Sequence, residues 1–169
     1  MNIWKQPVKE LAYYADIKSD INRIGELPVA FGCVDQQKPS FICGVSEDFN
    51  QKLIVTHNEI KARELYENYR GLDKNTYFYP AKDFIFYSAD IHGNQIVRDR
   101  LSVIEKLIKG ESITVITTVD GCMDKVIPPT LYKKYTRSIS VGDEIDIKEF
   151  SEYLVNVGYE HVTKTDEAG

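Results

Sequence analysis

One segment of the sequence comes close to a phosphate-binding loop. Residues 32–39, Gly-Cys-Val-Asp-Gln-Gln-Lys-Pro, follow the short apolar run of residues 27–31. They keep the frame of a P-loop, in which a glycine is followed after four residues by Gly-Lys-Ser/Thr. The lysine is present as Lys38, but Gln37 replaces the second glycine and Pro39 replaces the hydroxyl residue. In a complete loop, backbone N–H groups point at the phosphate and the hydroxyl binds Mg²⁺.

These replacements predict that the loop no longer binds a nucleotide. Gln37 would reach positive φ only at a cost of about 1 kcal/mol or more. Pro39 offers neither an N–H donor nor a hydroxyl, and Lys38 alone is a point charge on a flexible stem. We therefore interpret Gly32, Gln37, Lys38 and Pro39 as a vestigial P-loop, and we expect no catalytic residue and no cofactor in this chain. A functional ATP site and an unrelated loop with this spacing stay open as alternatives.

The remaining residues that could support chemistry form no familiar motif. His57, His92 and His161 are far apart and do not have the spacing of a metal site. Asp120 follows an apolar run, as a metal-binding acid would, but no second acid comes directly after it, so we interpret it as a helix cap or turn residue. The sequence has no GxSxG nucleophile motif. We therefore expect no metal site.

The composition is that of an ordinary soluble globular protein. The 169 residues are 43% hydrophobic and 28% charged, enough for one domain or one domain and a fragment. The net charge of −5 argues against a clamp for duplex DNA. Cys33, Cys43 and Cys122 form no CxxC pair and are expected to be buried free thiols. No leader and no run near the ~18 apolar residues of a membrane span is present, which predicts a cytoplasmic location without a membrane partner.

Apolar periodicity predicts helices that alternate with strands up to residue 129. Four short runs are expected to be buried strands, and the β-branched run 113–119 among them is expected to be central. Alternation of this kind predicts an α/β fold with a parallel, helix-covered sheet of degenerate P-loop or helicase type. The expected strands are residues 29–31, 53–55, 77–79 and 113–119.

Four helices are expected to cover this sheet. The first spans residues 7–24, the second begins at Pro39, and the third is capped by Thr56 or Asn58 and ends at Gly71. Residues 81–94 look irregular, and the fourth helix then runs to Gly110. The residues expected to face inward are Phe41, Ile42 and Val45 in the second helix, Ile60, Leu65 and Tyr69 in the third, and Val97, Leu101, Ile104 and Ile108 in the fourth.

The pattern changes after Pro129. Residues 137–141 and 159–165 alternate like half-exposed strands, with a turn at Gly142-Asp143. Between them Asp146 should cap a helix that ends at Gly158, with an apolar stripe of Ile147, Phe150, Leu154 and Val157. This predicts a small, incomplete α+β unit. The expected parts are an N-terminal helical segment, 1–26, a P-loop-like domain, 27–129, and a second unit, 130–169, whose strand stops in mid-pattern as if cut from a longer protein.

A few charged residues are candidates for contact with another domain or a partner. The alternative for Arg98 and Arg100 is a solvated helix face with weak local ion pairs. The alternative for Arg137, beside Lys133 and Lys134, is a charged solvated edge, which the overall acidity favours over a nucleic-acid site. The full set of candidates is Asp90, His92, Arg98, Arg100 and Arg137.

Taken together, these segments resemble the N-terminal region of bacterial transcription-repair coupling factors, which is itself similar to the first domains of the excision-nuclease protein UvrB. The resemblance covers nearly the whole chain after Leu27. It is carried by residues 32–39, 53–58, 79–83, 88–94 with Arg98 and Arg100, and 140–143 with the helix to Gly158.

The resemblance implies a noncatalytic, UvrB-like module of a multi-domain, ATP-driven DNA translocase that displaces stalled RNA polymerase. ATP and Mg²⁺ would bind in motor domains outside this chain, and RNA polymerase and DNA would be contacted there too. The module would recruit the excision-nuclease protein UvrA, with the complete second unit required, and would contact other domains to restrain the motor. UvrB itself has an intact loop and a longer tyrosine-rich hairpin. Here only Tyr77-Phe78-Tyr79-Pro80 precedes Lys82, which argues against that protein.

Two other functions stay open from the sequence. The chain could be a nucleotide-binding fragment of a helicase-like protein of the UvrB type, which requires an essential Lys38 and a Walker-B acid elsewhere. It could also be an unrelated α/β binding protein that is complete at Gly169.

Overall fold

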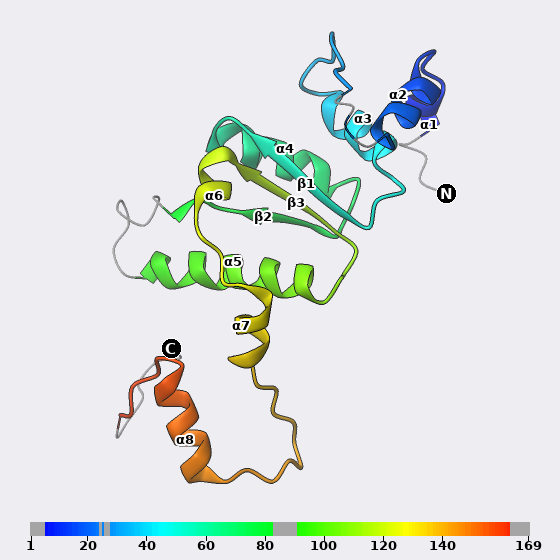
Figure 1. Ribbon diagram of the computed structural model, residues 1–169. Helices are drawn as coiled ribbons and strands as arrows, with labels where there is room; N and C mark the ends of the chain where they lie inside the picture. Colours follow the sequence, from blue (N-terminus) through cyan, green and yellow to red (C-terminus); the bar gives the residue numbers. More distant parts are fainter. Residues whose placement is uncertain (1–5, 24, 26–27, 83–90, 163–169) are drawn as a thin grey trace. The chain divides into compact units, whose positions relative to one another are not determined.

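The computed structural model describes residues 6–23, 25, 28–82 and 91–162, the side chains of 91–94 excepted. The chain divides into two compact units, Met1–Lys125 and Val126–Gly169. The first unit contains a three-stranded sheet, with β1 (Gln51–Thr56), β2 (Thr76–Tyr79) and β3 (Ile113–Thr118) all parallel in the order β1-β3-β2 (Figure 1). The predicted α/β class is therefore confirmed, whereas the division into three parts stays a prediction.

Strand β3 is central, as its β-branched sequence predicted. All six of its residues are buried, because β1 and β2 pair with its two edges. β1 is less covered than expected. Leu53 is 62% exposed and Val55 is 46% exposed, because β1 lies at the edge of the sheet. The prediction of a strand at 53–55 is confirmed, but the prediction that it is buried is wrong for these two side chains.

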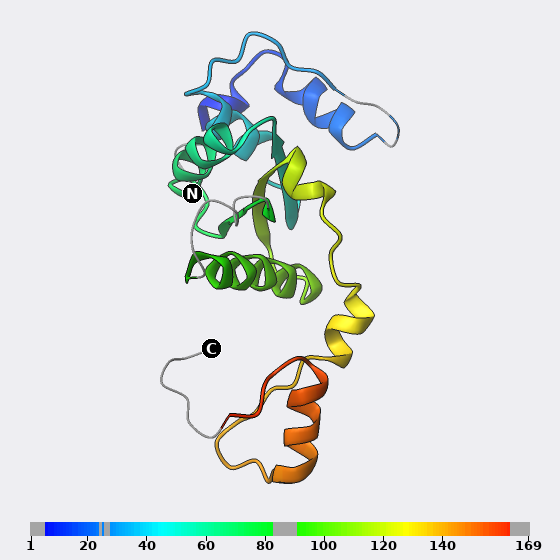
Figure 2. The ribbon, with the colours of Figure 1, turned by 90° about the vertical axis from the view of Figure 1, so that its left-hand side faces the viewer.

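Helices lie on both sides of the sheet (Figures 1 and 2). On one side α3 (Lys38–Val45) and α4 (Glu59–Arg70) enclose a cluster of Cys43, Ala62, Tyr69 and Ile116. On the other side α5 (Ile91–Ile108) packs on β2 and β3 around Tyr79, Val103, Ile113 and Val115. Side chains of β3 point alternately to the two faces of the sheet. Ile113 and Val115 therefore belong to the α5 cluster, and Ile116 belongs to the cluster under α3 and α4.

Helix α4 begins and ends where the sequence predicted. The Asn58 side chain accepts a hydrogen bond from the Lys61 N–H, and Gly71 is the C-cap. Tyr69 faces inward, but Ile60 is 77% exposed, so its predicted inward position is wrong. Ala62 is buried instead, because it lies on the side of α4 that packs against α3 and the sheet.

The inward face of α5 is rotated from the predicted stripe. Val97 and Leu101 are 46% and 45% exposed, whereas Arg100 and Val103 are buried. The side of α5 that carries Arg100 can be buried because the guanidinium has hydrogen-bond and ion-pair partners there. A pattern of apolar residues does not predict the burial of a charged side chain. The helix also begins at Ile91, inside the segment 81–94 that was predicted to be irregular. Residues 83–90 lie outside the described residues.

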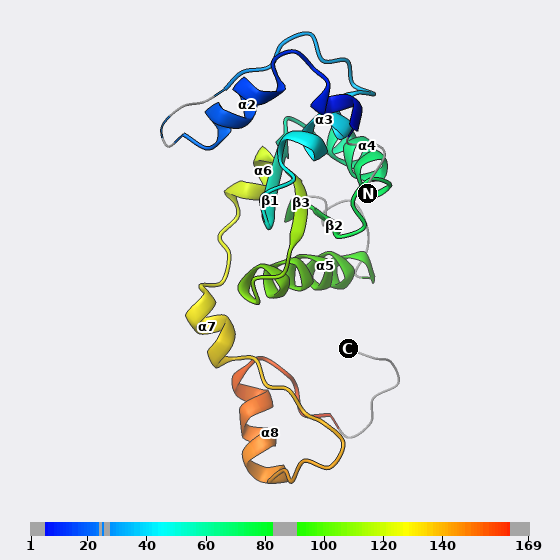
Figure 3. The same ribbon diagram turned by 90° about the vertical axis from the view of Figure 1, so that its right-hand side faces the viewer.

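The N-terminal segment differs from its prediction in two places. The expected helix of residues 7–24 is two shorter helices, α1 (Gln6–Lys9) and α2 (Tyr14–Ile21), which lie beside α3 (Figure 3). The expected buried strand at 29–31 is not a strand, and Val29 and Phe31 are 69% and 91% exposed. A strand is stable only beside a partner, and this segment pairs with none of the described strands.

The described residues of the second unit form helices joined by turns and irregular segments, and no strand. It contains α7 (Pro129–Lys134) and α8 (Ile147–Asn156), and Asp146 caps α8 by accepting from two backbone N–H groups, as predicted. The turn at Gly142 is confirmed by its φ of +104°. Residues 137–141 and 159–162 are not strands, because neither finds a partner strand among the described residues. Ile147, expected in the apolar stripe of α8, is 84% exposed.

Candidate functional site

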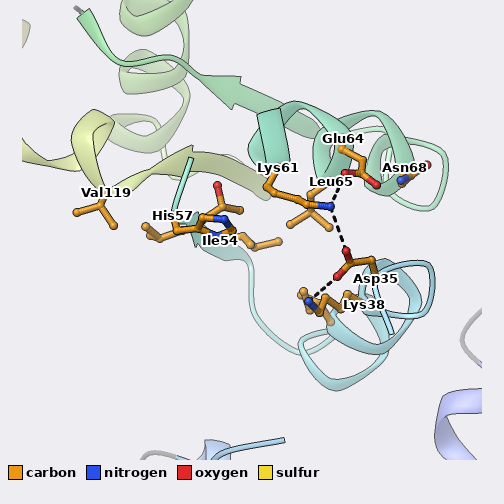
Figure 4. A pocket seen from close by; sticks show the side chains of 12 residues that line it. Asp35, Lys38, Ile54, His57, Lys61, Glu64, Leu65, Asn68 and Val119 are labelled. Atoms are coloured by element: carbon orange, nitrogen blue, oxygen red, sulfur yellow. Dashed lines mark hydrogen bonds and ion pairs between the residues drawn. The ribbon is translucent and has the colours of Figure 1, made fainter. Parts of the chain in front are cut away.

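A cavity of about 650 Å³ lies at the carboxyl end of β1. In open α/β sheets, ligands bind outside the carboxyl ends of parallel strands. The cavity combines an apolar wall with a charged rim (Figure 4). The apolar wall is formed by Ile42, Ile54, Val55, Leu65 and Val119, and the polar residues include Asp35, Lys38, His57, Lys61 and Glu64.

The charged rim is a chain of ion pairs with no net charge. Lys38 Nζ lies 2.7 Å from Asp35 Oδ1, and Lys61 Nζ lies 3.0 Å from Asp35 Oδ2 and 2.9 Å from Glu64 Oε2. Hydrogen bonds from Lys38 and then Lys61 lower the pKa of Asp35 to about 2. The Lys38 ammonium, which a phosphate would need, is therefore already paired.

The backbone of residues 34–38, inside the segment that the sequence predicts to be a vestigial P-loop, is folded as a turn. The N–H groups of Gln37 and Lys38 donate to the Val34 carbonyl at 2.9 and 3.2 Å, and Pro39 has no N–H. Gln37 adopts φ −88° and ψ −24° as the N-cap of α3, so the strain considered from the sequence does not arise. Gly32 has φ +79°. Two of the N–H groups that would face a phosphate are thus bonded inside the loop.

Arg100 is buried within the first unit. Its Nη1 donates to the Pro80 carbonyl at 2.5 Å and lies 3.1 Å from Asp124 Oδ2, and its guanidinium lies 4.1 Å from the centre of the Tyr79 ring. The interpretation as a solvated helix face is wrong, because only 7% of this side chain is exposed. The residue joins α5, the end of β2 and the end of α6 (Val119–Met123).

Of the other predicted contact residues in the first unit, Arg98 is not among the residues that line the cavity. Arg98 lies on the exposed side of α5. Arg137, in the second unit, pairs with Glu149 at 3.3 Å and lies against the Tyr153 ring. His92 is in α5, but its side chain lies outside the described residues, as does Asp90. Whether these residues contact a partner stays a prediction.

Some expectations about other polar residues are corrected. Thr118, not Asp120, caps α6 by accepting from the Gly121 N–H. Of the cysteines, Cys43 is buried as expected, but Cys33 is partly exposed and Cys122 is exposed. The described residues contain no group of acidic, histidine or cysteine side chains that could hold a metal ion. Within the same residues, no helix is long and apolar enough to cross a membrane.

Sequence reasoning missed the partners that define the site. Lys61 pairs with Asp35 across 26 positions, and no local motif links the two. The only available signal was topological, because a loop that precedes α3 and the first turn of α4 both lie at the carboxyl edge of a parallel sheet.

Comparison with known proteins identifies similar chains. The sequence is 27% identical over 160 residues to the transcription-repair-coupling factor of Staphylococcus epidermidis strain RP62A, and 26% identical over 151 residues to that of Bacillus subtilis strain 168, with 86% of this chain covered in both cases. The chain is similar to transcription-repair-coupling factors. The coupling factor of Staphylococcus aureus strain USA300 matches the whole chain at 23% identity over 172 residues.

The resemblance to transcription-repair coupling factors that the sequence predicted is thereby confirmed. No family model matches the chain. The chain spans 13 to 15% of the length of these coupling factors.

Proposed function

We propose that this chain is a noncatalytic module of a transcription-repair-coupling factor that acts in the cytoplasm. The module supports transcription-coupled excision repair by recruiting the excision-nuclease protein UvrA and by restraining the ATP-driven DNA translocase that displaces stalled RNA polymerase. Similarity to coupling factors along most of the chain supports the family. The observation that carries the noncatalytic role is the folded state of the vestigial P-loop.

The loop opposes nucleotide binding for two independent reasons. Its Gln37 and Lys38 N–H groups are bound to Val34, so a phosphate would have to break the turn to reach them. Its lysine faces Asp35, and the two acids on the rim balance the two lysines. A triphosphate requires aligned N–H donors and a positive field, and the rim offers neither.

Calorimetry with ATP and Mg²⁺ tests this part of the proposal. We expect no heat of binding from the 169-residue chain. A variant that restores the motif, Gln37→Gly with Pro39→Ser and Asp35→Ala, is the matched control, and any heat it gives shows that the assay detects a functional loop. Micromolar binding by the unsubstituted chain contradicts the proposal.

A nucleotide-binding fragment of the UvrB type is the second candidate. It is favoured by the place of the cavity, which lies at the carboxyl edge of a parallel sheet and is lined by Lys38. The two candidates differ in the role of this lysine. Lys38→Ala in the complete coupling factor should leave repair unchanged if the module is noncatalytic, and should abolish it if the cavity binds a nucleotide.

Recruitment of UvrA requires a separate test. We expect pull-down of UvrA by a longer form of the coupling factor that contains the complete second unit, and weak or no pull-down by the 169-residue chain. Failure of both forms to bind UvrA contradicts the recruiting role without affecting the nucleotide result.

A further inference from the structure

The cavity at the carboxyl end of β1 has the size and the lining of a small-molecule site. Its volume of about 650 Å³ falls inside the range of about 300 to 1,000 Å³ that such sites occupy. Small-molecule sites combine a mostly apolar lining with a few polar groups that fix the orientation of the ligand. This cavity has both, since an aliphatic wall and a charged rim line it (Figure 4). Its chemistry therefore indicates which class of ligand it suits.

The apolar wall of the cavity is held in place by the core of the first unit. Ile42, Ile54 and Leu65 are partly buried and pack against the cluster around Ile116. The same three side chains line the cavity, and Val119 of α6, which is 51% exposed, extends the wall. Covering apolar surface removes it from water, which is favourable. The wall therefore favours a ligand with a large aliphatic or aromatic group.

The charges of the rim alternate in sign along a chain of contacts. Lys38 Nζ lies 2.7 Å from one oxygen of Asp35, and Lys61 Nζ lies 3.0 Å from the other. Lys61 Nζ also lies 2.9 Å from Glu64 Oε2. All four side chains are between 42 and 50% exposed. A ligand can therefore approach these charges without breaking a buried ion pair.

Alternation of this kind selects a polar group that carries both charges. A carboxylate beside Lys61 and an ammonium beside Glu64 each meet an opposite charge. A ligand with a single charge leaves one of these two rim groups without a new partner, and it lies close to a rim charge of its own sign, which repels it. A triphosphate in the same place faces both Asp35 and Glu64.

We propose that the cavity binds a small zwitterion with a large apolar group, of which a free amino acid such as tryptophan or leucine is the simplest form. The apolar group lies on the aliphatic wall, the carboxylate beside Lys61 and the ammonium beside Glu64. Water screens these half-exposed charges, so we expect binding at millimolar concentrations. The inference rests on the proposed function only in the claim that the rim rejects phosphate. Heat of binding with ATP contradicts that claim, whereas the titrations below test the zwitterion site separately.

NMR titration of the 169-residue chain tests the proposal with three molecules that share an indole ring. At neutral pH L-tryptophan is a zwitterion, indole-3-propionate is an anion and tryptamine is a cation. We expect L-tryptophan to shift the methyl signals of Ile42, Ile54 and Leu65, and to bind several-fold more tightly than the other two. Absence of shifts at these methyl groups overturns the site. Equal affinities for the three molecules, or tighter binding of the anion or the cation, overturn the assignment to a zwitterion.

Variants of the rim identify which charge recognises which group. Lys61→Met should cancel the advantage of L-tryptophan over tryptamine, because these two molecules differ only by the carboxylate. Glu64→Gln should cancel its advantage over indole-3-propionate, which lacks the ammonium. Both side chains are at least 42% exposed, so neither substitution removes a buried contact. An advantage that persists in either variant overturns the assigned position of that group.

A variant of the wall tests the place of the apolar group. Val119→Ser should weaken the binding of all three molecules several-fold, because it replaces part of the aliphatic wall with a hydroxyl. Ile60→Ser is the matched control, since Ile60 is 77% exposed and is not among the residues that line the cavity. Equal effects of the two substitutions overturn the placement of the indole ring in the cavity.

Discussion

Asp35 is the residue on which the charged rim of the cavity depends. Its carboxylate accepts from Lys38 on one oxygen and from Lys61 on the other. The carboxylate is held charged by two cations that belong to different elements, α3 and α4. This pair of contacts holds the loop that precedes α3 against the first turn of α4.

The pKa of Asp35 should therefore respond to its two partners. By NMR titration we expect a midpoint of about 2. Lys38→Met should raise the pKa towards the ordinary value of 3.8, and Lys61→Met should raise it less, because the hydrogen bond from Lys38 is the larger cause. Since folding lowers this pKa, any stability it contributes is present above the ordinary value and is lost as pH falls through about 2. Lys9→Met, in a separate ion pair with Glu47, is the control and should leave the titration unchanged.

Arg100 is the buried charge that should be most sensitive to substitution. Arg100→Met leaves the Pro80 carbonyl and the Asp124 carboxylate without their cation. Removing one partner of a buried pair costs about 3 kcal/mol or more in the free energy of unfolding. Urea unfolding should show this loss. Arg98→Met on the exposed side of the same helix should cost less than about 1 kcal/mol, and equal costs for the two variants would contradict the assigned role.

The glycine of α3 controls how closely α1 approaches. A Cβ on Gly44 would lie 2.8 Å from Val8 Cγ1 and 2.9 Å from Val8 Cβ. Alanine normally favours a helix by about 1 kcal/mol over glycine, but the contact with α1 should reverse the sign. We expect Gly44→Ala to lower the free energy of unfolding by about 1 to 2 kcal/mol, as overpacked sites do.

Gly71→Ala provides the matched control for this prediction. Its nearest contact would be the Asn68 carbonyl oxygen at 3.5 Å, an ordinary separation. Chemical denaturation should show no loss of stability for Gly71→Ala. A Gly44→Ala variant that is as stable as the original chain would show that α1 moves aside without cost.

At the scale of elements, the sequence predicted correctly those features of helices and strands that depend on residues close together in the chain. The cap at Asn58 and the helix start next to Pro39 depend on neighbouring residues and were correct. The central position of β3 was also correct, because its own β-branched residues indicate burial on both faces. The inward face of α5 was not, because burial of Arg100 depends on Pro80 and Asp124, which lie 20 and 24 positions away. The strand expected at 137–141 was wrong, and so was the described part, 159–162, of the strand expected at 159–165, because strand formation needs a partner that an alternating pattern does not supply. Residues 163–165 lie outside the described residues.

The candidate site was also predictable only in part, because some of its features depend on contacts between residues that are distant in the sequence. The departures at Gln37 and Pro39 from the P-loop are visible in the sequence. The turn formed with Val34 and the ion pairs with Lys61 and Glu64 are not, because they depend on the packing of the loop against α4.

At the scale of the whole molecule, both apolar clusters belong to the first unit. Helices α7 and α8 contain no buried residue. We therefore expect residues 1–125 alone to fold and to unfold cooperatively, as followed by circular dichroism in urea. A noncooperative transition in the shortened chain would contradict this. The separate peptide of residues 126–169 is the control, and it should show little helix, because helices of this length are marginal without packing.

The strand order has a consequence for how the protein is made. β1 and β2 are not neighbours in the sheet, and among the strands that the structure describes each pairs only with β3. On the ribosome β1 is complete once Thr56 has been added, but its pairing edge has no partner until Thr118 is in place. At usual rates of synthesis this interval is about 3 to 12 seconds, to which emergence from the exit tunnel adds. A nascent chain stalled in this interval exposes one unpaired strand, and two once Tyr79 has been added, so the first unit should depend on chaperones during synthesis more than its size alone implies.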